Sequence, residues 1–496
     1  MAHDAIIVGS GSGGAAVARR LADAGARVCV IEAGDDPAGD PAVSDPAQWF
    51  SLQSGRWDWG HRYAAQPALN GREVPIPRGK ALGGSSVINA MMWYHGTPAD
   101  YASWDAVAPG WGWDDCLPIL RGVEDRNGGP LRISRGHGDH PLTRAMLAGG
   151  AAMGQPLRDS PNDGVAEGVA LADFNIDARG RRWTSADGYL RPAMGNGIDV
   201  LTGTRALRVL FEGDRAIGIQ VADAAGRRDL HASRIVLAAG ALETPRLLIL
   251  SGIGPEEELA RLGLPCRVAA PGVGQNLQDH PLLRAINVRA ARPLGPPVGN
   301  GGGTLTIWRS DPALADPDLL AFPIQNASGG PALRTVHDLS GEVFAIGLGV
   351  MRSHSRGWLR LTGPSPDDPL EIQPNLLSDP RDLRAMIEGV MFLQAMLETP
   401  AFSGLFGGHL APAGRVDRQG AEEFVRLACS TFFHTCGTSR MGGDEAAPCT
   451  PRLAVRGVRG LWIADAAAIP VIPACHTHAP TTLIGERAAR FIQEDA

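Results

Sequence analysis

The sequence predicts an α/β domain with a parallel sheet, joined to an α+β domain built on an antiparallel sheet. Near the N-terminus, the short apolar run Asp4–Val8 precedes a glycine-rich turn and a helix-forming segment, which is typical of a buried parallel strand. Much later, strand-like runs cover 341–351 and 358–362. A helix signal over 380–397 follows Asp379. These later elements indicate an antiparallel sheet backed by helices.

The bulk composition fits a large globular protein. A chain of 496 residues suggests roughly two to four structural units. The net charge is −7 and no basic stripe occurs, so nucleic acid is not an expected partner. No apolar run reaches the ~18 residues of a membrane span, and the N-terminus lacks the features of a secretory signal. The seven cysteines are irregularly spaced, which favours a reducing, cytoplasmic compartment over a disulfide framework.

The N-terminal turn has the pattern of a dinucleotide-binding loop. Gly9 permits a tight turn, Gly11 lets the backbone approach a pyrophosphate, and Gly14 allows close packing of helix and strand. A second strand over 27–31 ends at Glu32, whose carboxylate can accept hydrogen bonds from both ribose hydroxyls and would repel a 2′-phosphate. This order predicts a Rossmann-like site and argues against NADP, but it does not separate FAD from NAD.

Four further segments resemble the glucose–methanol–choline (GMC) oxidoreductase family. They occur in the family order, at 78–91, 240–254, 272–281 and 461–466. In the first, two glycines and two serines in a row suit a loop whose backbone N–H groups face a planar ligand. In the second, we expect a helix to begin at Thr244-Pro245. The resemblance spans Asp4 to Ile492 and implies FAD as the cofactor.

The resemblance also implies how the chain is divided. An FAD-binding domain is expected from 1–126, 196–285 and 431–496, and a substrate-binding domain with connecting segments from 127–195 and 286–430. The residues expected to contact FAD are Gly9, Gly11, Ser12, Gly14, Glu32, Gly83, Gly84, Ser85, Asn89, Ala206, Ala239, Asp465, Ala466, His478 and Thr481.

One position differs from the family pattern and bears on how FAD is attached. Some relatives attach FAD covalently through a histidine just before the asparagine of the first motif. Here Ile88 precedes Asn89, and an isoleucine cannot form that bond. We therefore expect non-covalent FAD.

Two histidines near the C-terminus are the expected catalytic pair. The resemblance assigns the base to His434, in the pattern H-x-x-G-T, and its partner to His476 or His478. If their segment is extended, the last two share one face, so periodicity cannot separate them. Counting from 461–465, the family partner falls on His476, and His478 then contacts the flavin. A neutral imidazole with a pKa of about 6.5 can accept a hydroxyl proton.

Several alternatives stay open. His478 could take the role of His476. A zinc site from His434, Cys436, His476 and His478 lacks a recognised ligand spacing, so no metal is expected. The expected reaction is FAD-dependent oxidation of an alcohol to an aldehyde or ketone. The rivals are an FAD-containing lyase of the hydroxynitrile lyase type, which would use the same histidine for acid–base cleavage, and a non-catalytic flavin-binding protein.

The expected partners of the protein are a small-molecule alcohol and an electron acceptor, either O2 or a carrier. Sequence motifs do not separate an oxidase from a dehydrogenase, and they leave aliphatic, aryl, choline-like and sugar alcohols as candidates. The Gly- and Pro-rich segment 292–303 is either a mobile loop over the active site or a surface linker.

Overall fold

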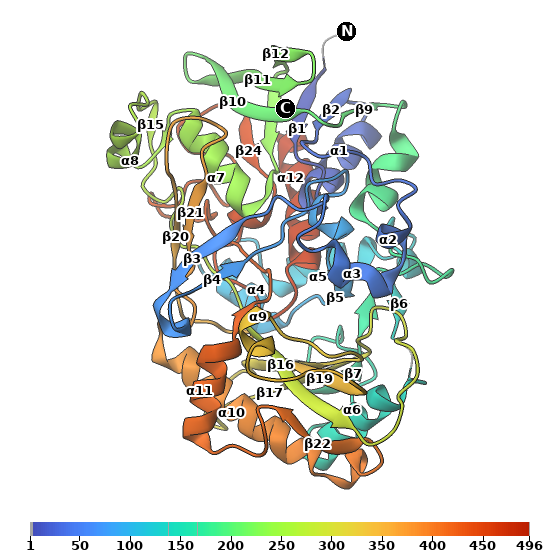
Figure 1. The fold of residues 1–496 in the computed structure, drawn as a ribbon. Helices are drawn as coiled ribbons and strands as arrows, with labels where there is room; N and C mark the ends of the chain where they lie inside the picture. Colours follow the sequence, from blue (N-terminus) through green and yellow to red (C-terminus); the bar gives the residue numbers. More distant parts are fainter. Residues whose placement is uncertain (1–2, 137, 166, 496) are drawn as a thin grey trace.

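The computed structural model describes residues 3–136, 138–165 and 167–495. One half of the molecule contains a parallel sheet with helices, and the other half contains a larger antiparallel sheet with helices (Figure 1). The first strand (Ala5–Val8) and the last helix (His478–Glu494) both lie at the parallel-sheet half. The predicted combination of an α/β and an α+β fold is therefore confirmed.

The parallel sheet is assembled from distant parts of the chain. Its order is β24-β13-β1-β2-β9, and all neighbouring pairs are parallel. The strands are β1 (Ala5–Val8), β2 (Val28–Ile31), β9 (Ile198–Leu201), β13 (Arg234–Leu237) and β24 (Leu461–Ile463). Two helices, α1 (Ser12–Asp23) and α12 (His478–Glu494), pack against each other beside this sheet. Because β24 and α12 come from the C-terminal end, the sheet joins both ends of the chain.

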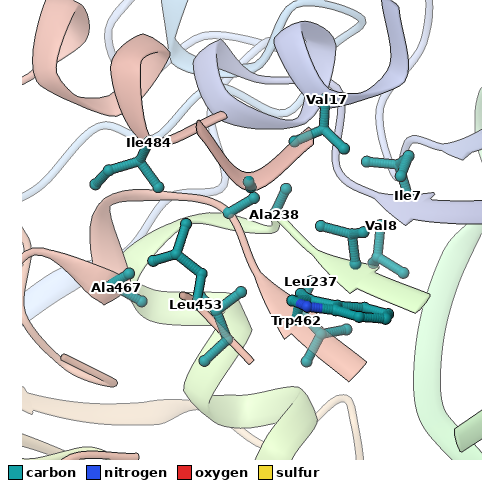
Figure 2. Close-up of a cluster of buried hydrophobic side chains, with 14 of the residues drawn as sticks. Ile7, Val8, Val17, Leu237, Ala238, Leu453, Trp462, Ala467 and Ile484 are labelled. Carbon is teal, nitrogen blue, oxygen red and sulfur yellow. The ribbon is translucent and has the colours of Figure 1, made fainter. Parts of the chain in front are cut away.

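The core of this half consists of buried apolar side chains. Figure 2 shows Ile7 of β1, Leu237 of β13, Val17 of α1 and Ile484 of α12 within one cluster of buried side chains, and all four have 0% exposure. Burying an aliphatic side chain of this size contributes about 1.5–3 kcal/mol. Such packing holds the loops at the carboxyl ends of the strands in fixed positions.

The antiparallel sheet has seven strands. Its main order is β22-β16-β19-β18-β17-β7, and β23 also pairs with β16. The strands are β7 (Gly168–Leu171), β16 (Pro281–Ala290), β17 (Thr304–Trp308), β18 (Leu319–Ile324), β19 (Val343–Val350), β22 (Phe406–Ala411) and β23 (Ser430–Thr431). Helices α6 (Pro141–Ala152), α10 (Pro380–Leu397) and α11 (Arg418–Ala428) pack on it.

The later sequence signals match these elements. The helix predicted over 380–397 is α10, and the carboxylate of Asp379 accepts a hydrogen bond from the backbone N–H of Arg381 at its start. The run at 341–351 contains β19. Strand β16 crosses residue 285, where the sequence placed a domain boundary, and the division into segments stays a prediction.

One helix begins earlier than expected. Helix α7 (Gly240–Leu250) starts at Gly240, so the expected start at Thr244-Pro245 is wrong and Pro245 lies inside the helix. A proline cannot donate to the carbonyl four residues earlier. The hydroxyl of Thr438 donates to that carbonyl, on Ala241, at 2.6 Å. The helix therefore tolerates Pro245 because a distant side chain replaces the missing donor.

Smaller elements complete the chain. A three-stranded antiparallel sheet contains β10 (Arg205–Glu212), β11 (Arg215–Asp223) and β12 (Gly226–His231). The others are α2 (Pro41–Ser44), α3 (Trp49–Leu52), β3 (Arg62–Gln66), β4 (Arg72–Pro75), β5 (Met92–Trp93), α4 (Pro98–Asp105), α5 (Trp113–Gly122), β6 (Ser134–Arg135), β8 (Asp173–Phe174), β14 (Ile253–Gly254), α8 (Glu256–Arg261), β15 (Val268–Ala269), α9 (Pro331–Arg334), β20 (Trp358–Leu361) and β21 (Leu370–Gln373).

Among the helices in the described ranges, none is long and apolar enough to cross a membrane. All seven cysteines are free thiols, and only Cys266 is exposed.

Candidate active site

A large cleft lies between residues of the two sheets. It encloses about 1770 Å³ of space free of protein atoms, part of it open to solvent. The loop after β1 and the end of β2 line one side, and Leu282 and Arg284 of β16 with Phe322 of β18 line another. The cleft therefore has a wall from the parallel sheet and a wall from the antiparallel sheet.

The cleft brings together most of the predicted site residues. Those that line it are Gly9, Gly11, Ser12, Glu32, Gly84, Ser85, Asn89, Ala206, Ala239, His434, Asp465, Ala466, His476, His478 and Thr481. Gly14 and Gly83 do not line it. A Cβ atom on Gly14 would lie 2.1 Å from the carbonyl oxygen of Gly9, so Gly14 allows close packing, as expected. The backbone N–H of Gly83 donates to the hydroxyl of Ser10 at 3.0 Å.

Two helices begin at the cleft. Helix α1 starts at Ser12 and α12 starts at His478, and Ser12 Oγ lies 2.7 Å from His478 Nδ1. The first N–H groups of a helix have no partner within it, and they attract anions. Paired helix N-termini therefore suit a pyrophosphate. The condition of an extended segment through both His476 and His478 is not met, because α12 begins at His478.

The two glycine-rich loops touch one another. A Cβ atom on Gly84 would lie 2.7 Å from Cα of Gly11, closer than real side chains allow. The loop after β1 and the loop of the first family motif therefore pack backbone to backbone at the cleft wall, and a side chain on Gly84 would separate them.

Glu32 lies at the end of β2 with its carboxylate already bonded. It accepts hydrogen bonds from the backbone N–H and hydroxyl of Ser10, at 3.2 and 2.5 Å, and from the N–H of Gly34 at 2.9 Å. Burial raises the pKa of this carboxyl, and the hydrogen bonds oppose that shift. The carboxylate holds the turn together and still has lone pairs for a further donor in the cleft.

Asp465 follows β24 and joins it to α7. It accepts hydrogen bonds from the Thr244 hydroxyl at 2.5 Å and from the backbone N–H groups of Gly240 and Ala467 at 2.7 Å each. Burial raises its pKa to about 6. Asp465 therefore shapes the cleft wall through protein contacts, whatever else it binds.

Two imidazoles meet on the antiparallel side of the cleft. The ring centroids of His434 and His476 are 5.1 Å apart, with an interplanar angle of 80°. The Phe432 ring stacks on His434 with a centroid distance of 4.7 Å. Both ring nitrogens of His476 are buried and lack a hydrogen-bond partner among the described residues. The distant segments that carry this predicted pair therefore place it in one cleft, with hydrogen-bonding capacity left over.

A third histidine, which the sequence interpretation missed, belongs to this cluster. His280 Nδ1 lies 2.9 Å from His434 Nδ1. The carboxylate of Asp279 accepts hydrogen bonds from the backbone N–H groups of His280 and His434, at 2.8 and 2.9 Å, and from the hydroxyls of Tyr63 and Thr431. A polar Asp-His pair just before an apolar run was the available signal in the motif 272–281.

The environment keeps these imidazoles neutral. Burial lowers the pKa of His280 and of His476 to about 3 and that of His478 to about 4. The pKa of His434 lies well below its usual value, first because of burial and then because of His280 and His476. A neutral imidazole has one nitrogen with a free lone pair, so each ring can accept a proton or a hydrogen bond.

The segment 292–303 is attached to the cleft wall. The side chain of Asn300 donates to the carbonyl of Ala90 at 2.6 Å, and the carbonyl of Asn300 accepts from the indole N–H of Trp49 at 2.9 Å. Ala90 and Trp49 both line the cleft. Whether the segment moves as a lid stays a prediction.

Metal binding finds no support in the described residues. No group of three His, Cys, Asp or Glu side chains there has the arrangement needed to hold a metal ion. The combination of His434 and His476 with Cys436 and His478 therefore gives no zinc site in the part of the chain described here.

The comparisons with known proteins now decide the family. A family model for GMC oxidoreductases matches residues 3–282 with its N-terminal part and residues 353–485 with its C-terminal part. The chain belongs to the GMC oxidoreductase family. It is therefore an FAD-dependent oxidoreductase, and FAD is its cofactor.

Three members illustrate the similarity. Human mitochondrial choline dehydrogenase is 33% identical over 536 residues, which cover 98% of this chain and 89% of that protein. The crystal structure of pyridoxine 4-oxidase from Mesorbium loti has a TM-score of 0.94 and 32% identity, with 99% of each chain covered. A formate oxidase structure from Aspergillus oryzae, studied for the effect of a mutation on FAD modification, has a TM-score of 0.91 and 26% identity, covering 99% of this chain and 98% of its own.

The cleft fits FAD by its own chemistry. Paired helix N-termini offer donors to a pyrophosphate, and Glu32 offers acceptor oxygens to a ribose. Buried nitrogens without partners, on His476 and His478, face the same cleft. The individual contacts to the cofactor remain predictions from the sequence. Non-covalent attachment of FAD also remains a prediction.

Proposed function

We propose that the protein oxidises a primary or secondary alcohol to an aldehyde or ketone. His434 accepts the hydroxyl proton, and His476 donates a hydrogen bond to the substrate oxygen as it gains negative charge. Bound FAD supplies the hydride acceptor, its N5 atom. Positioned general-base catalysis contributes about 10²–10⁴-fold to such a step.

The observation that carries the proposal is the close approach of two neutral, buried imidazoles in the FAD cleft. Their ring centroids lie 5.1 Å apart, so one substrate oxygen can contact both rings. His476 has no protein partner among the described residues, which leaves it available to the substrate. Asp279 accepts a hydrogen bond from the backbone N–H of His434, and His280 contacts its ring, so both the backbone and the ring of His434 are held.

The relatives support a CH–OH substrate. Choline and pyridoxine, named in two of them, both carry hydroxyl groups, and the third relative is named for formate. The free thiols support a reducing compartment such as the cytoplasm.

The test is an anaerobic panel of alcohols monitored by flavin absorbance. We expect at least one alcohol to bleach the oxidised flavin band and to yield the matching carbonyl compound. A lyase of the hydroxynitrile type would consume a cyanohydrin and leave the band unchanged. Cyanohydrin cleavage without bleaching by any alcohol would replace the proposal with the lyase.

A further inference from the structure

One arginine of the cleft wall has no acceptor for its charge among the described residues. Arg284 lies on β16 and lines the cleft together with Leu282, two residues earlier on the same strand. Its guanidinium forms no hydrogen bond or ion pair with any residue in the described ranges, and Nη1 is buried without a partner. Part of the side chain remains accessible because it faces the cleft. Arg284 therefore carries unpaired donors at the wall of the open space.

The surroundings of Arg284 are aromatic. Its guanidinium carbon lies 5.0 Å from the ring centroid of Phe50, 5.3 Å from that of Phe433 and 5.8 Å from that of Trp49. These rings attract a cation but offer no oxygen to its N–H groups. Burial lowers the pKa of Arg284 to about 10, so it stays charged at neutral pH. An unpaired charge in such a place costs folding free energy unless a ligand pairs with it.

The other two arginines that line the cleft are already satisfied. Arg78 donates to the Thr435 hydroxyl and to backbone carbonyls, and Arg205 pairs with Asp367 at 2.6 Å. The carboxylates lining the cleft, on Glu32, Glu243 and Asp465, belong to the parallel-sheet half and its helix α7. Arg284 therefore differs from these arginines in having donors but no acceptor.

We propose that Arg284 binds a carboxylate on the substrate, so that the alcohol oxidised here is an organic anion. The planar guanidinium can donate two parallel hydrogen bonds to a carboxylate. Phe433, which contacts Arg284, precedes His434 in the chain, so the anion site adjoins the imidazole cluster. This inference rests on the proposed function, since it names the substrate class of the same site.

The residues suited to the phosphates of FAD lie elsewhere. The N-termini of α1 and α12 lie at the parallel sheet, whereas Arg284 lies on the antiparallel sheet. Phosphates bound at those helix N-termini would leave the charge of Arg284 unmatched. The flavin ring is the other group that could pair with the charge of Arg284, and the binding test below distinguishes the two.

The kinetic test uses alcohol pairs that differ only in charge. 4-(Hydroxymethyl)benzoate is compared with 4-(hydroxymethyl)benzamide, and 3-hydroxypropanoate with 3-hydroxypropanamide, by anaerobic flavin reduction in the FAD-loaded protein. We expect about 10- to 100-fold higher reduction efficiency for the carboxylate of at least one pair, as charge-assisted hydrogen bonds predict. In Arg284→Met this ratio falls to near one. Arg289→Met removes the same charge from an exposed position on the same strand and leaves the ratio unchanged.

A binding test separates this inference from the proposed function. Benzoate and benzamide are titrated into the FAD-loaded protein, and binding is followed by the flavin difference spectrum. We expect benzoate to bind about 10- to 100-fold more tightly, with the preference lost in Arg284→Met. If no alcohol is oxidised but benzoate is preferred, the reaction is wrong and the anion site stands. If both carboxylates and amides bind or react equally, the anion site is wrong. An unchanged ratio in Arg284→Met with an altered flavin spectrum would assign the charge to the flavin and overturn the inference.

Discussion

The Nδ1 atoms of His280 and His434 lie 2.9 Å apart, and both rings are buried. Two neutral imidazoles at this distance share one proton, because one Nδ1 must donate and the other accept. A proton on His434 Nδ1 leaves its Nε2 lone pair free for a substrate proton. We infer that His280 is a positioning residue, which accepts this hydrogen bond and so selects the tautomer of His434.

Removing His434 should abolish most of the reaction without loss of the cofactor. For His434→Ala we expect flavin reduction by an alcohol substrate to fall about 10²–10⁴-fold, since the base is lost. Anaerobic stopped-flow absorbance measures the rate, and the flavin-to-protein absorbance ratio measures FAD content. His231→Ala, at an exposed position on β12, is the control and should behave as the unmodified protein. Unchanged reduction in His434→Ala would refute the assigned base.

Replacing His280 should lower the rate by releasing the His434 ring. The Nδ1 atom of His280 lies 2.9 Å from Nδ1 of His434, and we infer that it accepts the His434 proton. In His280→Leu that acceptor is lost, so we expect the rate of flavin reduction by an alcohol to fall while FAD content is retained. His280→Gln retains a hydrogen-bond acceptor and should recover part of the rate. Equal rates in His280→Leu and His280→Gln would leave His280 with a packing role only.

The buried histidines should make the protein sensitive to acid. The pKa of His476 is about 3 in the folded state and about 6.5 in an unfolded chain. The unfolded state therefore binds more protons below pH ~6.5, and stability present above that pH is lost as the pH falls toward the folded value. Each such group costs about 1.4 kcal/mol per pH unit in that window.

Urea unfolding at pH 7.5, 6.5 and 5.5 measures this effect. His476→Asn removes one titrating group, so its free energy of unfolding should fall by about 1 kcal/mol less between pH 6.5 and 5.5 than that of the unmodified protein. Equal pH slopes for the two proteins would show that His476 does not stay neutral in the folded state.

The cofactor should leave the protein on denaturation. Ile88 precedes Asn89 where some relatives carry a histidine that bonds to FAD. After precipitation with trichloroacetic acid, we therefore expect the yellow colour in the supernatant, as free FAD by chromatography. Flavin that stays in the pellet would mean a covalent link through another residue.

The features that the sequence pattern located are those that neighbouring residues determine. The turn at Gly9 and the helix behind Asp379 are set by neighbouring residues, so pattern alone located them. The approach of His434 and His476 followed only from family resemblance. No local pattern marked the start of α12 at His478, and the roles assigned to His476 and His478 stay predictions. No local signal revealed the Thr438 hydroxyl that lets Pro245 sit inside α7, or the absence of partners around Arg284, since both depend on residues far away in the chain.

The order of strands in the parallel sheet has a consequence for synthesis. Strand β24 pairs with β13, and α12 packs on α1, although the chain makes these partners more than two hundred residues apart. During synthesis, β13 has an unpaired backbone edge and α1 has an uncovered side until the last segment leaves the ribosome. We therefore expect FAD to bind after synthesis is complete, and a truncated chain lacking α12 to present an open, aggregation-prone surface rather than to act as a weaker enzyme.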